Sequence, residues 1–396
     1  MARSAPTADA ENHPEIEESA TGRVQFRQFD IADDESDHHF LNWNRPRKAS
    51  AGDPADCFSD VKSGVHKKIM KEWRVLERNL PEKIYVRVYE RRIDLLRAVI
   101  VGPPGTPYHD GLFFFDLAFP SDYPNRPPQV SYRSFGLRIN PNLYPNGIVC
   151  LSLLNTWFGR KNEKWNPAES TVLQVLVSIQ GLVLNQEPYF NEPGVSIFPG
   201  RAKKSMAYNE NAFIMSCKTM VYLLRNPPRN FSDFVNSHFR ERAASILEAC
   251  NAYREGWARV GCYCLNESDP NSNPQPVVVS SSFKATMKSW YEEMLLAFRM
   301  TGASLDHFVE QLRTEKRAGK EVGVGKRKKK KKKSKTTSSE LIPVKKKICA
   351  KTPPLRTLAI KGAKSGIRKV IIKIKKVLGL EKVGKKNADR IKVTPS

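Results

Sequence analysis

The sequence predicts an α+β domain flanked by polar and charged segments. Apolar residues at helical spacing over 65–80 are followed by four β-rich runs joined by short turns, and helical patterns return beyond Pro199. Consecutive strands joined by short turns favour an antiparallel meander with helices packed against it. Hydrophobic residues make up 40% of the 396 residues, which is enough for a core and excludes a wholly disordered protein.

Residues 1–64 are predicted to form a disordered acidic arm, because they hold 13 acidic against 7 basic residues. Their main apolar cluster indicates a short docking segment within the arm; it comprises Phe26, Phe29, Phe40 and Trp43. No stretch has the length of a signal peptide or of the roughly 18 apolar residues that span a bilayer. We therefore expect neither a secreted nor a membrane-spanning protein.

Residues 65–200 are predicted to be the folded core. Helical spacing over 65–80 ends at Pro81, and strands are expected at 84–89, 95–101, 112–119 and 129–133. Residues 136–168 lack a regular pattern but carry several Leu and Trp, so we expect an ordered functional loop. Ser170 is predicted to cap a helix over 171–184.

Residues 201–313 are predicted to extend this core with helices at 209–224, 232–257 and about 283–313. Residues 314–396 are predicted to be a basic, largely disordered tail, in which a basic amphipathic helix could form at 367–378. From Lys316 onward there are 29 basic and 4 acidic residues, so the whole net charge of +25 lies there. One lysine-rich block indicates a nuclear localisation signal, and hence a nuclear and/or cytoplasmic protein; it includes Lys326, Arg327, Lys328, Lys329 and Lys330.

The seven cysteines favour reduced thiols over a disulfide scaffold, because their number is odd and their spacing irregular. The pair Cys262 and Cys264 has no second Cys or His pair at zinc-site spacing, so no metal site is predicted.

Five motifs follow one another in register between residues 102 and 168: Gly102–Tyr108, Phe119–Pro128, Asn140-Pro-Asn142, Gly147–Leu151 and Trp165–Ala168. Together they resemble the core of ubiquitin-conjugating enzymes (E2s) over roughly residues 65–195. Finer matches at 141–144, 150–157, 174–178 and 188–193 are similar to the large E2s that include the plant phosphate-homeostasis E2 and the animal E2/E3 hybrid enzymes. This resemblance reaches about residue 257 and implies the E2 (UBC) fold.

The resemblance implies that Cys150 accepts ubiquitin from the activating enzyme (E1) as a thioester and passes it to a substrate lysine, with E3-like autonomy as an option. A thiol suits this task, because a thiolate is a good leaving group and a free thiol has a pKa near about 8.5. An isolated cysteine would instead be interpreted as a small buried hydrophobe. A papain-like Cys/His pair would need a histidine beside Cys150; His109 and His238 are the candidates that the fold could supply.

Further roles are implied by the same resemblance. Asn142 either steadies the loop or donates a hydrogen bond to the oxyanion formed when lysine attacks. Asn191 and Glu192 are candidates for guiding the incoming lysine, and Glu192 is a weak one. The basic stripe of Lys67, Lys68 and Lys71 corresponds to the helix face that engages E1. No cofactor is implied, because ATP is used by E1; the partners are ubiquitin, E1, a substrate protein and an optional E3.

The chain also departs from the family pattern. Asn140 replaces the family's histidine, Ser152 stands where small E2s often have Asp, and Asn125 replaces an aromatic residue used in binding RING-type ligases. Trp165 follows Cys150 by 15 residues, farther than in small E2s, so residues 155–163 form an insertion beside the active site. This insertion could shape access of a substrate or a ligase.

Two other function classes compete with an active E2. A non-catalytic E2-like scaffold is disfavoured because such proteins lack the cysteine. A nucleic-acid-binding protein acting through its tail would bind polyanions in a salt-dependent way, but the tail lacks interleaved aromatics and a recognition fold. Non-specific contact with polyanions remains an expected property of the tail.

Overall fold

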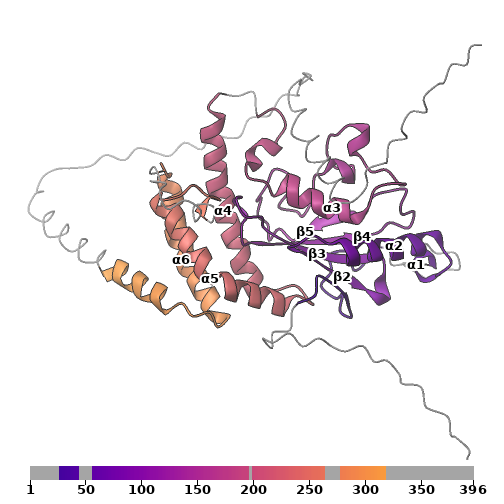
Figure 1. The fold of residues 1–396 in the computed structure, drawn as a ribbon, viewed down its shortest axis with the longest axis horizontal. Coiled ribbons are helices and arrows are strands. Elements are labelled where there is room, and N and C mark those ends of the chain that lie inside the picture. Colours follow the sequence, from indigo (N-terminus) through magenta and orange to yellow (C-terminus); the bar gives the residue numbers. More distant parts are fainter. Residues whose placement is uncertain (1–25, 44–55, 196–198, 264–276, 318–396) are drawn as a thin grey trace, which may run out of the picture.

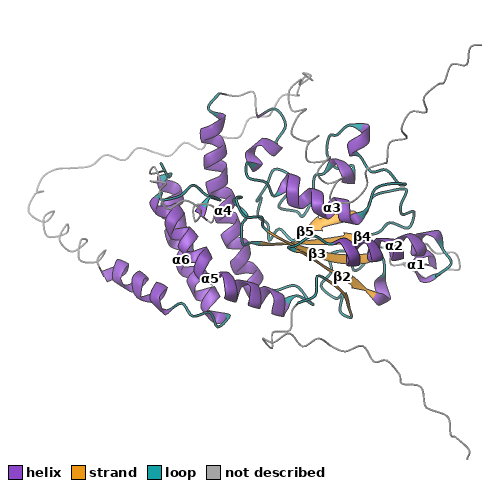
Figure 2. Ribbon diagram, in the orientation of Figure 1, coloured by secondary structure: helices purple, strands orange, loops and turns teal. Residues whose placement is uncertain are grey.

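A five-stranded sheet lies between two sets of helices in the computed structural model, which describes residues 26–43, 56–195, 199–263 and 277–317 (Figures 1 and 2). The strands are β1 (Phe29–Ala32), β2 (Ile84–Tyr89), β3 (Leu95–Val101), β4 (Leu112–Ala118) and β5 (Gln129–Tyr132). The principal helices are α1 (Asp56–Ser59), α2 (Gly64–Asn79), α3 (Val172–Ser178), α4 (Arg201–Arg225), α5 (Ser232–Glu255) and α6 (Ser281–Met300).

Five short helices lie between these elements within the described residues. Four are 3₁₀-helices: η1 (Glu90–Arg92), η2 (Ser152–Leu154), η3 (Lys161–Glu163) and η5 (Pro188–Asn191). The fifth, η4 (Ile179–Val183), is a π-helix that continues α3. No helix among these described ranges is long and apolar enough to cross a membrane.

The predicted antiparallel meander is confirmed for β2 to β5, which pair in sequence order. All seven residues of β3 are buried, because the two faces of the sheet support different cores. On one face Ala98 and Phe115 pack with α2 and α3, and on the other Val99 and Phe114 pack with α4 and α5. The helical extension therefore covers a sheet face and is not a separate appendage.

The prediction that residues 1–64 form a disordered arm is wrong for residues 26–43 and for residues 56–64, which contain α1 and the start of α2. Strand β1 adds to the sheet edge in parallel with β2, with Phe29 opposite Val86. Arg97, buried in β3, fixes the following segment: its guanidinium donates to Asp37 Oδ1 at 2.6 Å and to Asp116 Oδ1 at 2.6 Å. The expected docking segment therefore exists, and it is built into the fold by a sheet edge and a buried ion pair.

Three helix limits differ from the sequence prediction. Thr171, and not Ser170, is the N-cap of α3, because its hydroxyl accepts from Gln174 N at 3.2 Å while Ser170 Oγ accepts from Asn166 N. Helix α4 starts at Arg201, eight residues before the expected start at residue 209. The expected last helix is broken after α6 at Gly302, whose φ of +83° is left-handed, and residues 306–317 form a second helical segment. The expected tail boundary at residue 314 therefore falls inside a helix.

Candidate active site

Cys150 lies in an ordered loop after β5, where its backbone is held from both sides. Its N–H donates to Asn142 O at 2.8 Å, and its carbonyl accepts from Asn142 Nδ2 at 2.8 Å. The preceding turn requires glycine: Gly147 has φ +89°, and a Cβ there would lie 2.7 Å from Ser131 Oγ. Residues 140–150 thus fold back on themselves and fix Cys150 against the 140–142 turn.

The Cys150 thiol is unpaired with any other cysteine, and the residue is only 7% exposed. Burial raises the pKa of this thiol; the negative charge of Glu192 adds to the rise, and Arg138 opposes it. Arg138 stands over the Tyr144 ring, 4.4 Å from its centroid. The thiol is therefore mainly protonated at neutral pH. Such a thiol can accept an acyl group from an activated thioester, whereas attack on an unactivated amide needs a thiolate.

The histidine candidates for a protease-like pair have other partners. His109 Nδ1 lies 2.8 Å from Asp110 Oδ2, and its Nε2 lies 3.0 Å from the Tyr253 hydroxyl. His238 Nε2 bonds to the carbonyl of Asp110 at 2.8 Å. Both rings thus serve the contact between the turn that joins β3 to β4 and helix α5, and the structure gives no support to a papain-like Cys/His pair.

Asn142 braces the loop through its donor side. One Nδ2 hydrogen bonds to the Cys150 carbonyl, while Oδ1 is buried and has no hydrogen-bond partner among the described residues. The bracing role is therefore visible in the contacts. The second Nδ2 hydrogen is the group that would serve an oxyanion role.

Asn140 occupies the centre of a buried hydrogen-bond network that sequence reasoning missed. Its Nδ2 donates to the Tyr108 hydroxyl at 2.8 Å and to Val183 O at 2.7 Å, and its Oδ1 accepts from Asn142 N at 2.8 Å. Asn191 joins the network, since its Nδ2 donates to Val183 O at 3.1 Å. The replacement of the family's histidine thus keeps a buried polar hub that orients Asn142.

This network changes the interpretation of the two residues expected to guide lysine. Asn191 uses both ends of its amide inside the protein, because its Oδ1 also accepts from Asn185 Nδ2 at 2.6 Å. Glu192 is exposed, and its charge acts on Cys150. Of the pair, Glu192 presents an exposed carboxylate whose charge reaches the thiol, and Asn191 acts as a brace.

The basic stripe on α2 divides into two parts. Lys67 and Lys71 are exposed. Lys68 Nζ lies 3.8 Å from the buried Glu72 carboxylate, which also accepts from the Tyr123 hydroxyl at 2.8 Å. Burial raises the pKa of Glu72, and Lys68 partly offsets this. Lys68 therefore has a structural partner, whereas Lys67 and Lys71 remain available for a protein partner.

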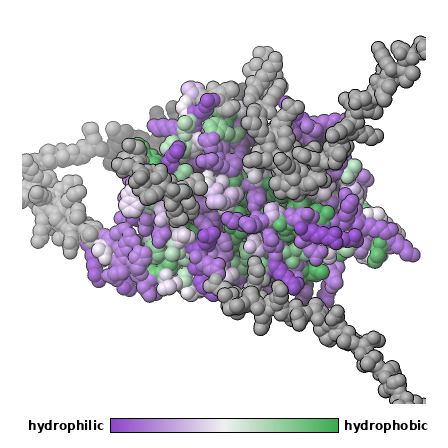
Figure 3. Space-filling view, in the orientation of Figure 1, coloured by the Kyte–Doolittle hydropathy of each residue, from purple (hydrophilic) through white to green (hydrophobic). Residues whose placement is uncertain are grey.

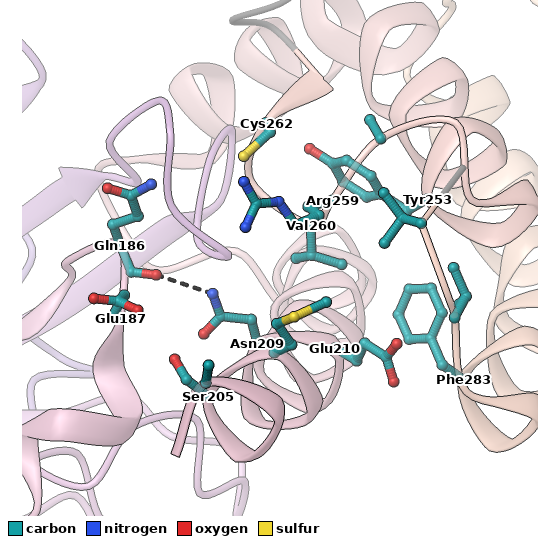
Figure 4. Close-up of a pocket in the computed structure, with 15 residues that line it drawn as sticks. Gln186, Glu187, Ser205, Asn209, Glu210, Tyr253, Arg259, Val260, Cys262 and Phe283 are labelled. Carbon is teal, nitrogen blue, oxygen red and sulfur yellow. Dashed lines mark hydrogen bonds between the residues drawn. The ribbon is translucent and has the colours of Figure 1, made fainter. Parts of the chain in front are cut away.

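A pocket of about 220 Å³ lies between residues 186–187, the first part of α4, the segment after α5 and the start of α6 (Figure 4). Asn209 Nδ2 donates to Gln186 O at 2.9 Å across its wall. Its lining does not include Cys150. The Cys150 thiol is thus not part of this pocket. The predicted localisation residues Lys326–Lys330 and the 367–378 segment lie outside the described residues.

Residues 68–213 match the family model for "Ubiquitin-conjugating enzyme". The chain is 53% identical to the "Putative ubiquitin-conjugating enzyme E2 38" of Arabidopsis thaliana over 58% of this chain and 68% of that protein. It is 52% identical to the "Probable ubiquitin-conjugating enzyme E2 25" of the same plant, over 68% of this chain and 43% of that protein.

A more distant relative is the human "Dual E2 ubiquitin-conjugating enzyme/E3 ubiquitin-protein ligase BIRC6", 37% identical over 58% of this chain and 5% of that protein. The chain spans less than half the length of three Arabidopsis relatives, the probable enzymes E2 23, E2 24 and E2 25. The matched region contains the whole sheet except β1, the Cys150 loop and the Asn140 network. The chain therefore belongs to the ubiquitin-conjugating enzyme (E2) family.

Proposed function

We propose that Cys150 accepts ubiquitin from an E1 enzyme and transfers it to a lysine of a substrate protein. The observation that carries this proposal is the reciprocal pair of hydrogen bonds between Cys150 and Asn142, which fixes an unpaired thiol in an ordered loop within the matched family domain.

The two steps conserve the thioester until the final transfer. In the first step, Cys150 Sγ attacks the carbonyl of the ubiquitin–E1 thioester, and the E1 thiolate leaves. The proton of the Cys150 thiol passes to solvent or to the departing E1 thiolate. In the second, a lysine amine attacks the new thioester, and the Cys150 thiolate leaves. Asn142 would donate to the oxyanion in this step, and Glu192 would accept from the attacking amine. ATP is consumed by E1, so this chain needs no cofactor of its own.

The exposed Lys67 and Lys71 support the proposal that α2 engages E1. A cluster of positive charges attracts an acidic surface of a partner and raises the association rate at low salt. The similarity to a protein named as a dual E2 and E3 supports some autonomy from a separate ligase. The basic tail supports nuclear accumulation and non-specific polyanion contact.

The test is a charging reaction with E1, ATP and ubiquitin, analysed on non-reducing and reducing gels. Wild-type protein should form an adduct that thiol reagents cleave, and Cys150→Ser should form an ester that resists them. A thiol-sensitive adduct on Cys150→Ser would contradict the assignment, because the thioester would then lie on another cysteine.

A further inference from the structure

The insertion beside the active site is anchored on both sides of Cys150. The Thr156 hydroxyl donates to Val149 O at 2.7 Å and accepts from Leu151 N at 3.0 Å. Ser152 Oγ donates to Phe158 O at 2.8 Å. The loop thus has a fixed position relative to the thiol.

The same loop is closed on itself by its one acidic residue. Glu163 Oε2 accepts from Arg160 N at 3.0 Å, and Glu163 N donates to Arg160 O at 2.9 Å. Gly159 lies so close to Ser152 that a Cβ would fall 2.5 Å from Ser152 Oγ. The turn is tightly built, and the Glu163 carboxylate is directed at the backbone.

What the loop presents outward is aromatic and basic. Phe158 is 87% exposed and packs edge-on beside Trp157, with ring centroids 6.2 Å apart. Three basic side chains beside them are exposed: Arg160, Lys161 and Lys164. We name these five residues the aromatic-basic surface.

A single exposed apolar side chain is ordinary on a protein surface, but Phe158 lies beside a second aromatic ring and three exposed cations. The face drawn in Figure 3 is mostly hydrophilic, with hydrophobic residues in small patches. Aromatic side chains and arginine are enriched at the centres of protein–protein contacts. The position of this surface, bonded to the residues on either side of Cys150, places any partner beside the thioester.

We propose that the aromatic-basic surface binds an acidic segment, containing an apolar side chain, of the acceptor protein and so selects which lysine is modified. The proposal rests on the proposed transfer function. The partner is acidic because the surface carries three exposed cations and its one carboxylate is turned inward. Phe158 supplies the apolar contact, and the cations supply charge selection.

The test uses the full chain charged with ubiquitin in single-turnover reactions. Three acceptors are compared: free lysine, a peptide whose lysine is flanked by Glu and Leu, and the same peptide with Arg in place of Glu. The variants are K161E/K164E and F158A. The matched control is K284E/K288E, which reverses two exposed lysines on α6 and leaves the tail unchanged.

The ratio of the acidic-peptide rate to the basic-peptide rate should fall in K161E/K164E by about 2- to 5-fold for each charge reversed, and should stay at the wild-type value in K284E/K288E. F158A should slow both peptides while leaving free lysine unchanged. E1-dependent charging should be normal in every variant.

An unchanged peptide ratio in K161E/K164E would overturn the proposal. Equal slowing of free lysine in F158A would also overturn it, because the loop would then act on the donor thioester. Slower charging by E1 in K161E/K164E or F158A would also overturn the proposal, because the surface would then bind E1 and not the acceptor protein. Absence of any charging in wild-type protein would contradict the proposed function itself, a result distinct from all of these.

Discussion

Replacing Asn140 with alanine removes the centre of the network behind the active loop. Asn140 is fully buried, and its amide makes three close hydrogen bonds, to the Tyr108 hydroxyl, Val183 O and Asn142 N, at 2.7–2.8 Å. Alanine offers none of these bonds. The Asn142 N–H and the Val183 carbonyl would remain in the core without that partner.

Each net hydrogen bond contributes about 1 kcal/mol, and an orphaned buried group costs about 1–3 kcal/mol. The bond from Asn191 at 3.4 Å is long and adds little. The free energy of unfolding should therefore fall by about 3 kcal/mol. For a folded region of this size that corresponds to a decrease in Tm of roughly 6–12 °C.

Thermal unfolding followed by circular dichroism measures this effect. Asn125→Ala is the matched control, because Asn125 is exposed in the turn after β4 and its loss should change Tm by less than about 2 °C. A decrease below 2 °C in Asn140→Ala would refute the inference that this amide is the hub that holds the loop.

Three further predictions follow from particular contacts. If the Asn142 amide also serves the oxyanion, Asn142→Ala should slow discharge to lysine about 10²-fold beyond any loss of loading caused by losing its bond to the Cys150 carbonyl; discharge that falls only in step with loading would contradict that role. Burial lowers the pKa of His38 and of His238, so the unfolded chain takes up protons first and the free energy of unfolding should decrease as pH falls below about 6.5. In urea titrations from pH 8 to pH 5, a His38→Gln/His238→Gln variant should show a weaker decrease, and a slope equal to that of wild type would exclude both groups. A chain ending at Arg317 should keep charging but lose nuclear accumulation and most nucleic-acid binding, as seen in gel assays and salt titrations; a folded truncated chain that cannot be charged would show that the tail belongs to the enzyme.

The chain end at Arg317 is chosen from contacts in the structure. The sequence suggests ending the folded part at residue 313, but Glu315 accepts from Arg254 at 3.1 Å and Lys316 bonds to Glu292 at 2.8 Å. Truncation at 313 would remove both pairs together with the end of a helix.

Local patterns predicted the parts of the fold that depend on local pairing. The meander from β2 to β5 and helix α2 follow from periodicity, turns and Pro81, because each strand pairs with its neighbour in sequence. Strand β1 could not be predicted in this way. It is four residues long, and it pairs in parallel with residues more than 50 positions away.

The site was predictable in its chemistry and not in its contacts. Motifs in register placed Cys150 and Asn142 in one loop, and the structure joins them by two hydrogen bonds. The bracing role of Asn191 and the engagement of Lys68 with Glu72 depend on side chains that meet only after folding. Two motifs in the sequence contained members of the network, since Tyr108 of the G-x-x-x-T-P-Y turn and Asn142 both contact Asn140.

Intact-mass measurement after E1-dependent charging tests most directly whether Cys150 is the one thiol that carries ubiquitin. Wild-type protein and Cys57→Ala, which removes a half-buried thiol elsewhere, should each gain the mass of one ubiquitin, and this gain should disappear on treatment with a thiol reagent. Cys150→Ala should gain none. A ubiquitin adduct that forms on Cys150→Ala at the wild-type rate and is cleaved by the same reagent would show that another thiol carries ubiquitin.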